Sequence, residues 1–368
     1  MIRTCDVGSL PLRSNPDKFR EGARSSQTIL PALGIGGDSY RAFEEEVVGG
    51  FIDKMKAGID TPNYPQLRDM NEMFFELFRG VERTGGQYAA TSKIEARPSS
   101  AIPEVSILKR NLSRIRDATG SSRVPVKACI TGPYTLSAFF PMRDPGLIEQ
   151  LGGELAKITA NSLFKARGGE VRMLCIDEPT LGFLNDPLLD YGSRGRDSLR
   201  GAWEEICSAA SSRGVETSIH LHDTSDDLFW EVEHLDMIES HVGDPLYELE
   251  KTKRKLEETD KALKASVAIT LFDNLISNQL VSQGLSGEIS QQVGDVWTDI
   301  RHGRADPRDF MESPELLEKR LSVIVARFGE ERVPYACPEC GLGGWPDYET
   351  AIECLRRVSE VVKEFNRG

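Results

Sequence analysis

The sequence predicts an α/β protein, and within that class a (β/α)8 TIM barrel. Short apolar runs alternate with helical patterns along the chain, which is typical of parallel strands joined by helical crossovers. The length of 368 residues suits a barrel of about 250 residues with insertions. A doubly wound dinucleotide-binding sheet is disfavoured, because the glycine-rich segment Gly34 to Ser39 lacks the last glycine of that fingerprint.

Five apolar runs, several of them rich in β-branched residues, are predicted to be strands. They are Val124–Ile130, Arg172–Ile176, Val215–Leu221, Leu235–Ile238 and Arg332–Ala336. Helical patterns separate them, for example Pro145–Ala166 and Leu199–Ser212. Each run is followed at its C-terminal side by polar residues. The C-terminal face of the strands carries the active site in TIM barrels, so we expect the functional side chains there.

We expect a single domain over residues 1–368 with two insertions. Residues 25–40 contain one proline and three glycines and are predicted to be a loop before an acidic helix. Residues 259–293 contain the apolar run Ser266–Phe272 followed by a polar tail with scattered glycines. We interpret this second segment as an insertion that covers the active site or a partner surface.

Charge and cysteine usage narrow the functional class. The chain has 58 acidic and 45 basic residues, a net charge of −13, and its densest basic run, Lys251–Lys255, is closely followed by acidic residues. Nucleic acid is therefore not an expected partner. No stretch of eighteen apolar residues predicts a membrane span. The seven scattered cysteines and the absence of a signal-peptide pattern indicate reduced thiols and a cytoplasmic protein.

Four of the five histidines fall between residues 220 and 241. His220 and His222 lie two residues apart at a predicted strand end, so their side chains share one face. Glu239 ends the next apolar run, and Cys337-Pro338-Glu339-Cys340 follows the last one. Each feature alone is more typical of ordinary structure or of a loop. Together, imidazole, carboxylate and thiolate groups at one barrel mouth predict one zinc ion per chain, in an open site.

Seven short motifs occur in an order that resembles a known family. They are Val7-Gly8-Ser9-Leu10-Pro11, Gln66-Leu67-Arg68-Asp69-Met70, Ile130-Thr131-Gly132-Pro133, Ile176-Asp177-Glu178-Pro179, Ile219-His220, Ile238-Glu239-Ser240 and Pro338-Glu339-Cys340-Gly341-Leu342. Together they resemble the catalytic C-terminal barrel of cobalamin-independent methionine synthase. The nearest form is the short archaeal and bacterial one that lacks the N-terminal barrel. The resemblance runs nearly end to end, apart from the two predicted insertions.

The resemblance implies a methyltransferase that makes methionine from homocysteine, with zinc activating the substrate thiol. It implies that His220, Glu239 and Cys340 are zinc ligands. It also implies that Ser9 and Gln66 hold the substrate amino acid and that Asp177 receives its ammonium group. The plainer alternatives are that Gly8-Ser9 is only a turn and that Asp177-Glu178 only caps a helix.

The sequence departs from the family at the metal site. The family has an H-x-C motif, and this chain has His222 in place of the cysteine. Either His222 binds zinc in its place, or Cys337 supplies the missing thiolate. We favour Cys337, because losing a thiolate ligand makes a zinc-bound substrate thiolate less nucleophilic.

A second departure concerns the methyl donor. Folate-using members carry a D-I-H-S segment whose histidine helps protonate the leaving group. The stretch Val296–Gly303 resembles it, with Arg301 at the histidine position and His302 one residue later, where it could still act as a general acid. A methylated corrinoid protein needs no such proton and is the donor we expect, rather than methyltetrahydrofolate. The alternatives are another acceptor thiol, such as coenzyme M, or a non-catalytic binding homologue with an altered metal site.

Overall fold

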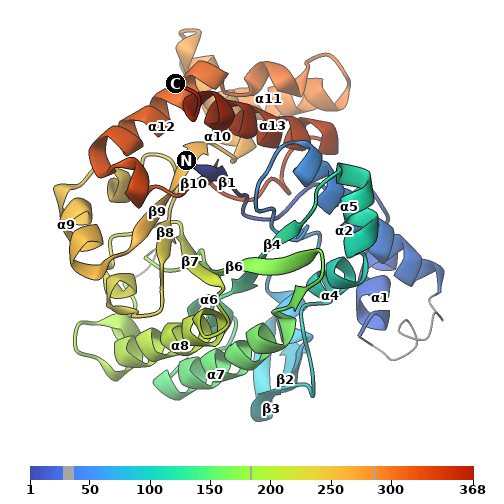
Figure 1. Cartoon of the computed structure of the whole chain (residues 1–368), viewed down its shortest axis with the longest axis vertical. Coiled ribbons are helices and arrows are strands. Elements are labelled where there is room, and N and C mark those ends of the chain that lie inside the picture. Colours follow the sequence, from blue (N-terminus) through green and yellow to red (C-terminus); the bar gives the residue numbers. More distant parts are fainter. Residues whose placement is uncertain (28–36, 183–184, 286) are drawn as a thin grey trace.

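A closed ring of parallel strands forms the centre of the molecule in a computed structural model that describes residues 1–27, 37–182, 185–285 and 287–368 (Figure 1). The strand order is β1-β10-β9-β8-β7-β6-β4, and each neighbouring pair is parallel. The bounds are β1 Arg3–Thr4, β4 Val124–Thr131, β6 Gly169–Glu178, β7 Glu216–Leu221, β8 Met237–Glu239, β9 Ala262–Ala268 and β10 Tyr335–Pro338. The predicted TIM barrel is confirmed, and the five predicted strands correspond to β4, β6, β7, β8 and β10.

The eighth position of the barrel is filled by an irregular segment, residues 61–66. It forms single parallel bridges on both sides, from Thr61 to Cys5 after β1 and from Asn63 to Lys127 in β4. Backbone hydrogen bonds from Thr61 N to Thr4 O (2.9 Å) and from Tyr64 N to Lys127 O (3.1 Å) join it to the two flanking strands. This segment therefore closes the ring, although it is not a regular strand.

Helices surround the ring (Figure 1). They include α2 Asp38–Lys56, α4 Pro103–Arg110, α5 Leu112–Thr119, α7 Pro145–Ser162, α8 Arg194–Ser211, α9 Glu250–Thr259, α12 Pro314–Phe328 and α13 Tyr348–Phe365. The apolar faces of these helices form one core with the outward-facing strand residues. The predicted helices over 145–166 and 199–212 correspond to α7 and α8. Among the described helices, none is both long enough and apolar enough to span a bilayer.

Several additions lie outside the simple barrel pattern. Helix α1 (Pro16–Ser25) precedes α2, and the hairpin of β2 (Phe78–Thr84) and β3 (Gln87–Ala96) packs beside α7 (Figure 1). Helices α10 (Phe272–Ser282) and α11 (Ile289–Arg301) follow β9. Most of the loop predicted at 25–40 lies outside the described residues, because 28–36 are not among them.

The predicted insertion at 259–293 needs correction. Its apolar run overlaps β9, which lies between β8 and β10 and is an integral barrel strand. The extra structure after the strand consists of α10 and α11. The sequence was misleading because the Ser266–Phe272 run spans both the end of β9 and the start of α10.

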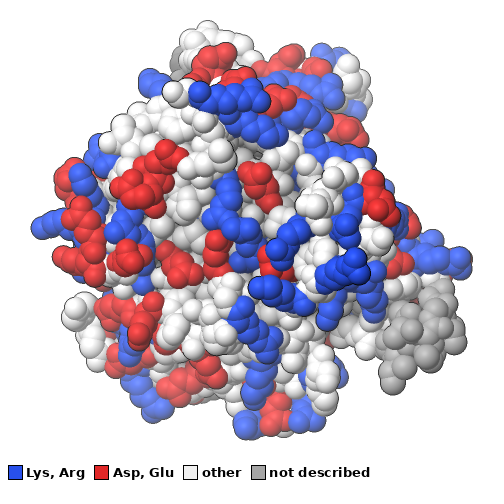
Figure 2. All heavy atoms as spheres, in the orientation of Figure 1, with Lys and Arg blue, Asp and Glu red and all other residues white. Residues whose placement is uncertain are grey.

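Charged side chains of both signs are interspersed over the face drawn in Figure 2. One ion pair, in contrast, is buried in the protein. It lies where residues 61–66 close the barrel. Lys54 Nζ in α2 lies 2.6 Å from Asp6 Oδ2, with both side chains at most 4% exposed. It also donates to the carbonyl oxygens of Gly8 (2.7 Å) and Asn63 (3.2 Å), while Asp6 Oδ1 accepts from Asn63 N (2.8 Å). This network fixes the closing segment to the turn that follows β1.

We expect Lys54→Met to lower the free energy of unfolding by about 3–5 kcal/mol, because it leaves Asp6 buried without its cation. The measurement is equilibrium unfolding in urea. The control is Arg41→Met, which breaks the exposed ion pair with Asp38 and should change stability by less than about 1 kcal/mol. Equal effects of the two substitutions would show that the buried pair has no special structural role.

Candidate active site

The C-terminal ends of neighbouring strands bring three histidines and one cysteine together. His220 is in β7 and His222 follows it, His241 lies two residues after β8, and Cys340 lies two residues after β10. One possible ligand atom from each of these residues lies within 4.8 Å of the others. The cluster is therefore at the face where the sequence predicts a metal site.

The distances in the cluster suit a four-coordinate metal ion. Cys340 Sγ lies 3.7 Å from His222 Nε2, and the ring centres of His222 and His241 are 4.1 Å apart. Zinc bound tetrahedrally to nitrogen and sulfur places neighbouring ligand atoms about 3.3–3.6 Å apart. The observed spread of up to 4.8 Å is wider, so binding would draw the outermost ligand atoms inward.

Unpaired nitrogen atoms in the cluster support this interpretation. Both ring nitrogens of His220 are buried without a hydrogen-bond partner, and so is Nε2 of His241. The His220 side chain is fully buried. A buried polar atom without a partner costs about 1–3 kcal/mol, and a ligand supplies the missing contact. The residues present therefore fit a bound metal ion.

The protonation states of the isolated side chains are set by burial. Burial lowers the pKa of His220 well below its usual value, and burial together with His241 lowers the pKa of His222 to about 4. Both imidazoles are therefore neutral near pH 7, which is the form that binds metals. Burial and the nearby Asp177 raise the pKa of the Cys340 thiol to about 12. A positive ion at the site would oppose this shift and favour the thiolate.

The structure brings together three of the five ligands expected from the sequence, namely His220, His222 and Cys340. The other two, Glu239 and Cys337, are adjacent but contact each other, with Cys337 Sγ donating to Glu239 Oε1 at 3.0 Å. The preference for Cys337 over His222 does not fit this geometry. Cys337 points into the barrel interior and packs in a buried cluster with Cys5, Met173, Met237 and Tyr335.

The sequence interpretation missed His241. The sequence does contain a pattern that points to His241. His241 follows Glu239 by two residues, as His222 follows His220, so its side chain is expected on the same face of the strand end as that of Glu239. Glu339, next to Cys340, holds this part of the site in place. Its carboxylate accepts hydrogen bonds from Val242 N and Thr270 N, both at 2.9 Å.

The residues expected to bind the substrate line the same barrel mouth. Asp177 in β6 is paired in register with His220 on one side and Thr131 on the other. It is 6% exposed, its Oδ1 has no partner, and burial raises its pKa well above the usual value. Helix capping is performed by its neighbour Glu178, which accepts from two backbone N–H groups at the start of α6 (Pro133–Ser137). Asp177 is therefore available for a cationic ligand.

Ser9 and Gln66 lie side by side at the closing point of the barrel, joined by a single parallel bridge. Ser9 Oγ accepts a hydrogen bond from Gly343 N at 3.0 Å, so the turn after β1 contacts the loop that follows Cys340. A side chain at Gly341 would overlap Ser9 Oγ. The position of Ser9 is thus coupled to the loop that carries the cysteine of the cluster.

His302 does not lie at a strand end. The stretch Val296–Gly303 is largely helical and falls in α11, and His302 is exposed just after this helix, with Nδ1 2.7 Å from Thr298 O. The barrel strand that precedes β10 in the sequence is β9, and Ile269-Thr270-Leu271 follows it. The stretch that resembles the D-I-H-S segment therefore lies in a helix and does not end a barrel strand.

A cavity of about 590 Å³ opens onto the cluster. His222, His241 and Cys340 form one side, and Phe272 of α10 and Trp297 of α11 form part of another. The helices after β9 therefore contribute directly to the cavity wall. This volume is sufficient for a small amino acid together with part of a larger second substrate.

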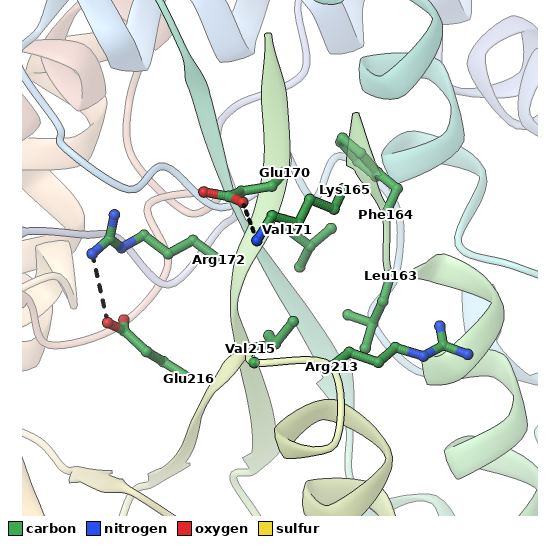
Figure 3. A pocket seen from close by; sticks show the side chains of 10 residues that line it. Leu163, Phe164, Lys165, Glu170, Val171, Arg172, Arg213, Val215 and Glu216 are labelled. Carbon is green, nitrogen blue, oxygen red and sulfur yellow. Dashed lines mark ion pairs between the residues drawn. The ribbon is translucent and has the colours of Figure 1, made fainter. Parts of the chain in front are cut away.

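Another cavity, of about 420 Å³, lies at the opposite end of the barrel, near the starts of β6 and β7 (Figure 3). Four of its charged side chains form ion pairs, Lys165 with Glu170 and Arg172 with Glu216, and Arg213 donates to the carbonyl oxygen of Ala160. The cluster of possible metal ligands lies at the other face. We therefore place the candidate active site at the cavity beside Cys340.

Comparison with known proteins shows which proteins the chain is similar to. No family model matches the chain. A methionine synthase from Thermococcus kodakarensis is 25% identical over 346 residues, which cover 90% of this chain and 86% of that protein. The solved structure of a B12-independent methionine synthase from Shewanella sp. W3-18-1 has a TM-score of 0.61 at 13% identity and covers both chains almost completely. The chain is therefore similar to methionine synthases in sequence and shares the fold of a B12-independent methionine synthase.

The relatives that the chain matches differ in length. A 5-methyltetrahydropteroyltriglutamate–homocysteine methyltransferase from Streptomyces griseus is 22% identical, and the match covers 99% of this chain but 42% of that protein. The chain spans less than half the length of that relative. The match to the Thermococcus protein involves chains of similar length.

In this methionine synthase relative, Gly341→Ala tests whether the Ser9 turn and the Cys340 loop must touch. The added Cβ would overlap Ser9 Oγ, so we expect a lower melting temperature and weaker retention of added zinc. The control is Gly344→Ala in the same loop, where a Cβ would meet no atom within 4 Å and little should change. The measurements are thermal unfolding with and without zinc and metal analysis after dialysis. Equal behaviour of the two variants would argue against this contact.

Proposed function

We propose that the chain transfers a methyl group to the thiol of homocysteine and so forms methionine, with a zinc ion at the barrel mouth. One observation carries the proposal: a cluster of imidazole and thiol groups, some of them unpaired, lies beside a buried carboxyl group that also lacks a partner. The cluster of His220, His222, His241 and Cys340 fits a metal ion, and the carboxyl group of Asp177 fits the ammonium group of an amino acid. Relatives named methionine synthase and homocysteine methyltransferase support the same reaction.

His220, His222 and Cys340 would hold the zinc ion. Bound there, zinc would lower the pKa of a substrate thiol from about 8.5 and favour the nucleophilic thiolate at neutral pH. The histidines remain neutral because they are buried, so they add no positive charge that would oppose metal binding. The prediction of one zinc per chain remains part of this proposal.

Asp177, Ser9 and Gln66 would bind the amino-acid end of homocysteine. Asp177 offers a carboxylate oxygen that makes no hydrogen bond, and an ammonium group would stabilise its ionised form. Ser9 and Gln66 add a hydroxyl and an amide at the closing segment. A sulfonate thiol without an ammonium group would leave Asp177 unpaired, so homocysteine fits this site better than coenzyme M.

The methyl donor expected from the sequence, a corrinoid protein, has no support among the relatives. Three of them are named for 5-methyltetrahydropteroyltriglutamate. We therefore propose a folate-type donor, bound in the cavity that Trp297 and Phe272 help to form. His302 is not part of this proposal, because it is exposed at the end of α11 and bonded to its own helix.

The first experiment measures zinc content together with methyl transfer to homocysteine. We expect about one zinc per chain and methionine formation from methyltetrahydropteroyl triglutamate, with methylcobalamin as the comparison donor. Cys340→Ser and His222→Ala should each lower zinc retention and abolish turnover, because they remove proposed ligands.

Cys337→Ser is the matched control, because Cys337 is buried next to the site but hydrogen-bonded to Glu239. It should keep its zinc and most of its activity. If Cys337→Ser lost its zinc and His222→Ala kept it, Cys337 and not His222 would be the zinc ligand. Zinc-loaded protein that forms no methionine from either donor would contradict the proposed reaction.

Asp177→Asn tests the ammonium site. Replacing a charge-assisted hydrogen bond by a neutral one should cost about 1.5–3 kcal/mol, which lowers kcat/KM for homocysteine roughly 10- to 150-fold. The control substrate is 4-mercaptobutanoate, which lacks the amino group and should react with both proteins at similar rates. An equal loss with both substrates would mean that Asp177 does not bind the ammonium group.

A further inference from the structure

The carboxylate of Glu239 lies close to the cluster but is occupied by other groups. Its Oε2 forms an ion pair with Lys264 Nζ, and its Oε1 accepts a hydrogen bond from Cys337 Sγ at 3.0 Å. The side chains of Glu239 and Lys264 are both completely buried. Displacing Glu239 toward a metal would leave Lys264 as an uncompensated buried charge, which is strongly destabilising.

Strand register maintains this ion pair. β8 and β9 are parallel neighbours, with Met237 opposite Ala262 and Ile238 opposite Leu263. Continuing this register places Glu239 opposite Lys264, and both side chains point into the barrel. Their contact therefore follows from the barrel itself and not from a flexible loop.

His241 is the fourth member of the cluster and can bind the metal in place of Glu239. The three histidine rings form a triangle, and the centre of the His241 ring lies 4.1 Å from that of His222 and 5.6 Å from that of His220. The Nε2 atom of His241 is buried without a partner. Three imidazoles and one thiolate then make a set of four protein ligands without a carboxylate, and a substrate thiolate would bind as a fifth ligand.

Glu239 does contact the cluster, through the ring of His220. Its Oε1 lies 3.8 Å from His220 Nδ1. Metal-binding histidines commonly direct their second ring nitrogen at a carboxylate, which fixes the ring and its tautomer. In this arrangement Nδ1 of His220 faces Glu239, and Nε2 remains for the metal.

We propose that His241, and not Glu239, is the fourth protein ligand of the metal centre, and that Lys264 holds Glu239 beside His220 as an outer positioning group. The inference rests on the proposed metal site, but it does not depend on the substrate or on the methyl donor. It implies a site with one anionic ligand, so a bound divalent ion keeps one unit of positive charge. Such a centre attracts an anionic thiolate more strongly than a centre that also carries the Glu239 carboxylate.

Zinc K-edge X-ray absorption tests the ligand set, because imidazole rings give a countable scattering pattern. We expect three imidazoles and one sulfur in the wild-type chain loaded with one zinc. His241→Ala should show two imidazoles. Glu239→Gln should still show three, with zinc affinity lowered about 10- to 100-fold, as is usual when an outer partner of a ligand is changed.

Glu239→Gln leaves Lys264 buried without its partner and could therefore unfold. The double variant Glu239→Gln/Lys264→Met removes both charges together, and thermal unfolding in the presence of a chelator checks that it folds. We expect it to bind one zinc through three imidazoles.

The outcomes separate this inference from the proposed function. Two imidazoles in the wild type, with no change in His241→Ala, would overturn the inference and leave the methyltransferase proposal standing. A wild-type chain that binds no zinc would overturn both. Three imidazoles without methyl transfer would support the inference and contradict the proposed reaction.

Discussion

The Lys54–Asp6 ion pair is the contact on which the barrel and its active site depend. Seven strands form regular ladders, but residues 61–66 close the ring through single bridges. Lys54 connects the turn after β1 to this segment, and Lys127 Nζ in β4 adds a hydrogen bond to Asp6 O at 2.7 Å. Ser9 and Gln66 lie just beyond this network. The geometry of one half of the proposed substrate site therefore depends on the buried ammonium group of Lys54.

Buried lysines recur deeper in the barrel and determine which groups can bind a ligand. Lys264 is fully buried and neutralises Glu239, and together with Lys127 it keeps the pKa of that carboxyl at about 2 despite burial. Such a pair contributes little net stability compared with an apolar core, but removing one partner is costly. The barrel interior thus carries fixed charges close to the metal cluster. The cluster itself is left with neutral imidazoles and one thiol.

Much of the barrel was predictable, because apolar runs with polar C-terminal ends define β4, β6, β7, β8 and β10. The closing segment was not, since residues 61–66 contain two prolines and no apolar run. The sequence predicts that His220, His222 and Cys340 lie near one another, because all three are at the C-terminal ends of predicted parallel strands and the two-residue period places His220 and His222 on one face. The role of Lys264 was hidden, because a lysine in a strand is usually exposed and only the three-dimensional pairing shows it buried.

Glu339 connects the cluster to the helices that follow β9. Its carboxylate binds the backbone at Val242, next to His241, and at Thr270, just after β9, while Cys340 follows it directly. Trp345 Nε1 also donates to Thr270 O at 2.8 Å, and the Trp345 ring packs on Phe272 at the start of α10. A movement of α10 or α11 would therefore also displace His241 and Cys340, because Trp345, Thr270 and Glu339 connect these helices to the cluster. Because these helices also line the cavity, a second substrate bound beside Trp297 would be positioned by the same groups that position the proposed metal ligands.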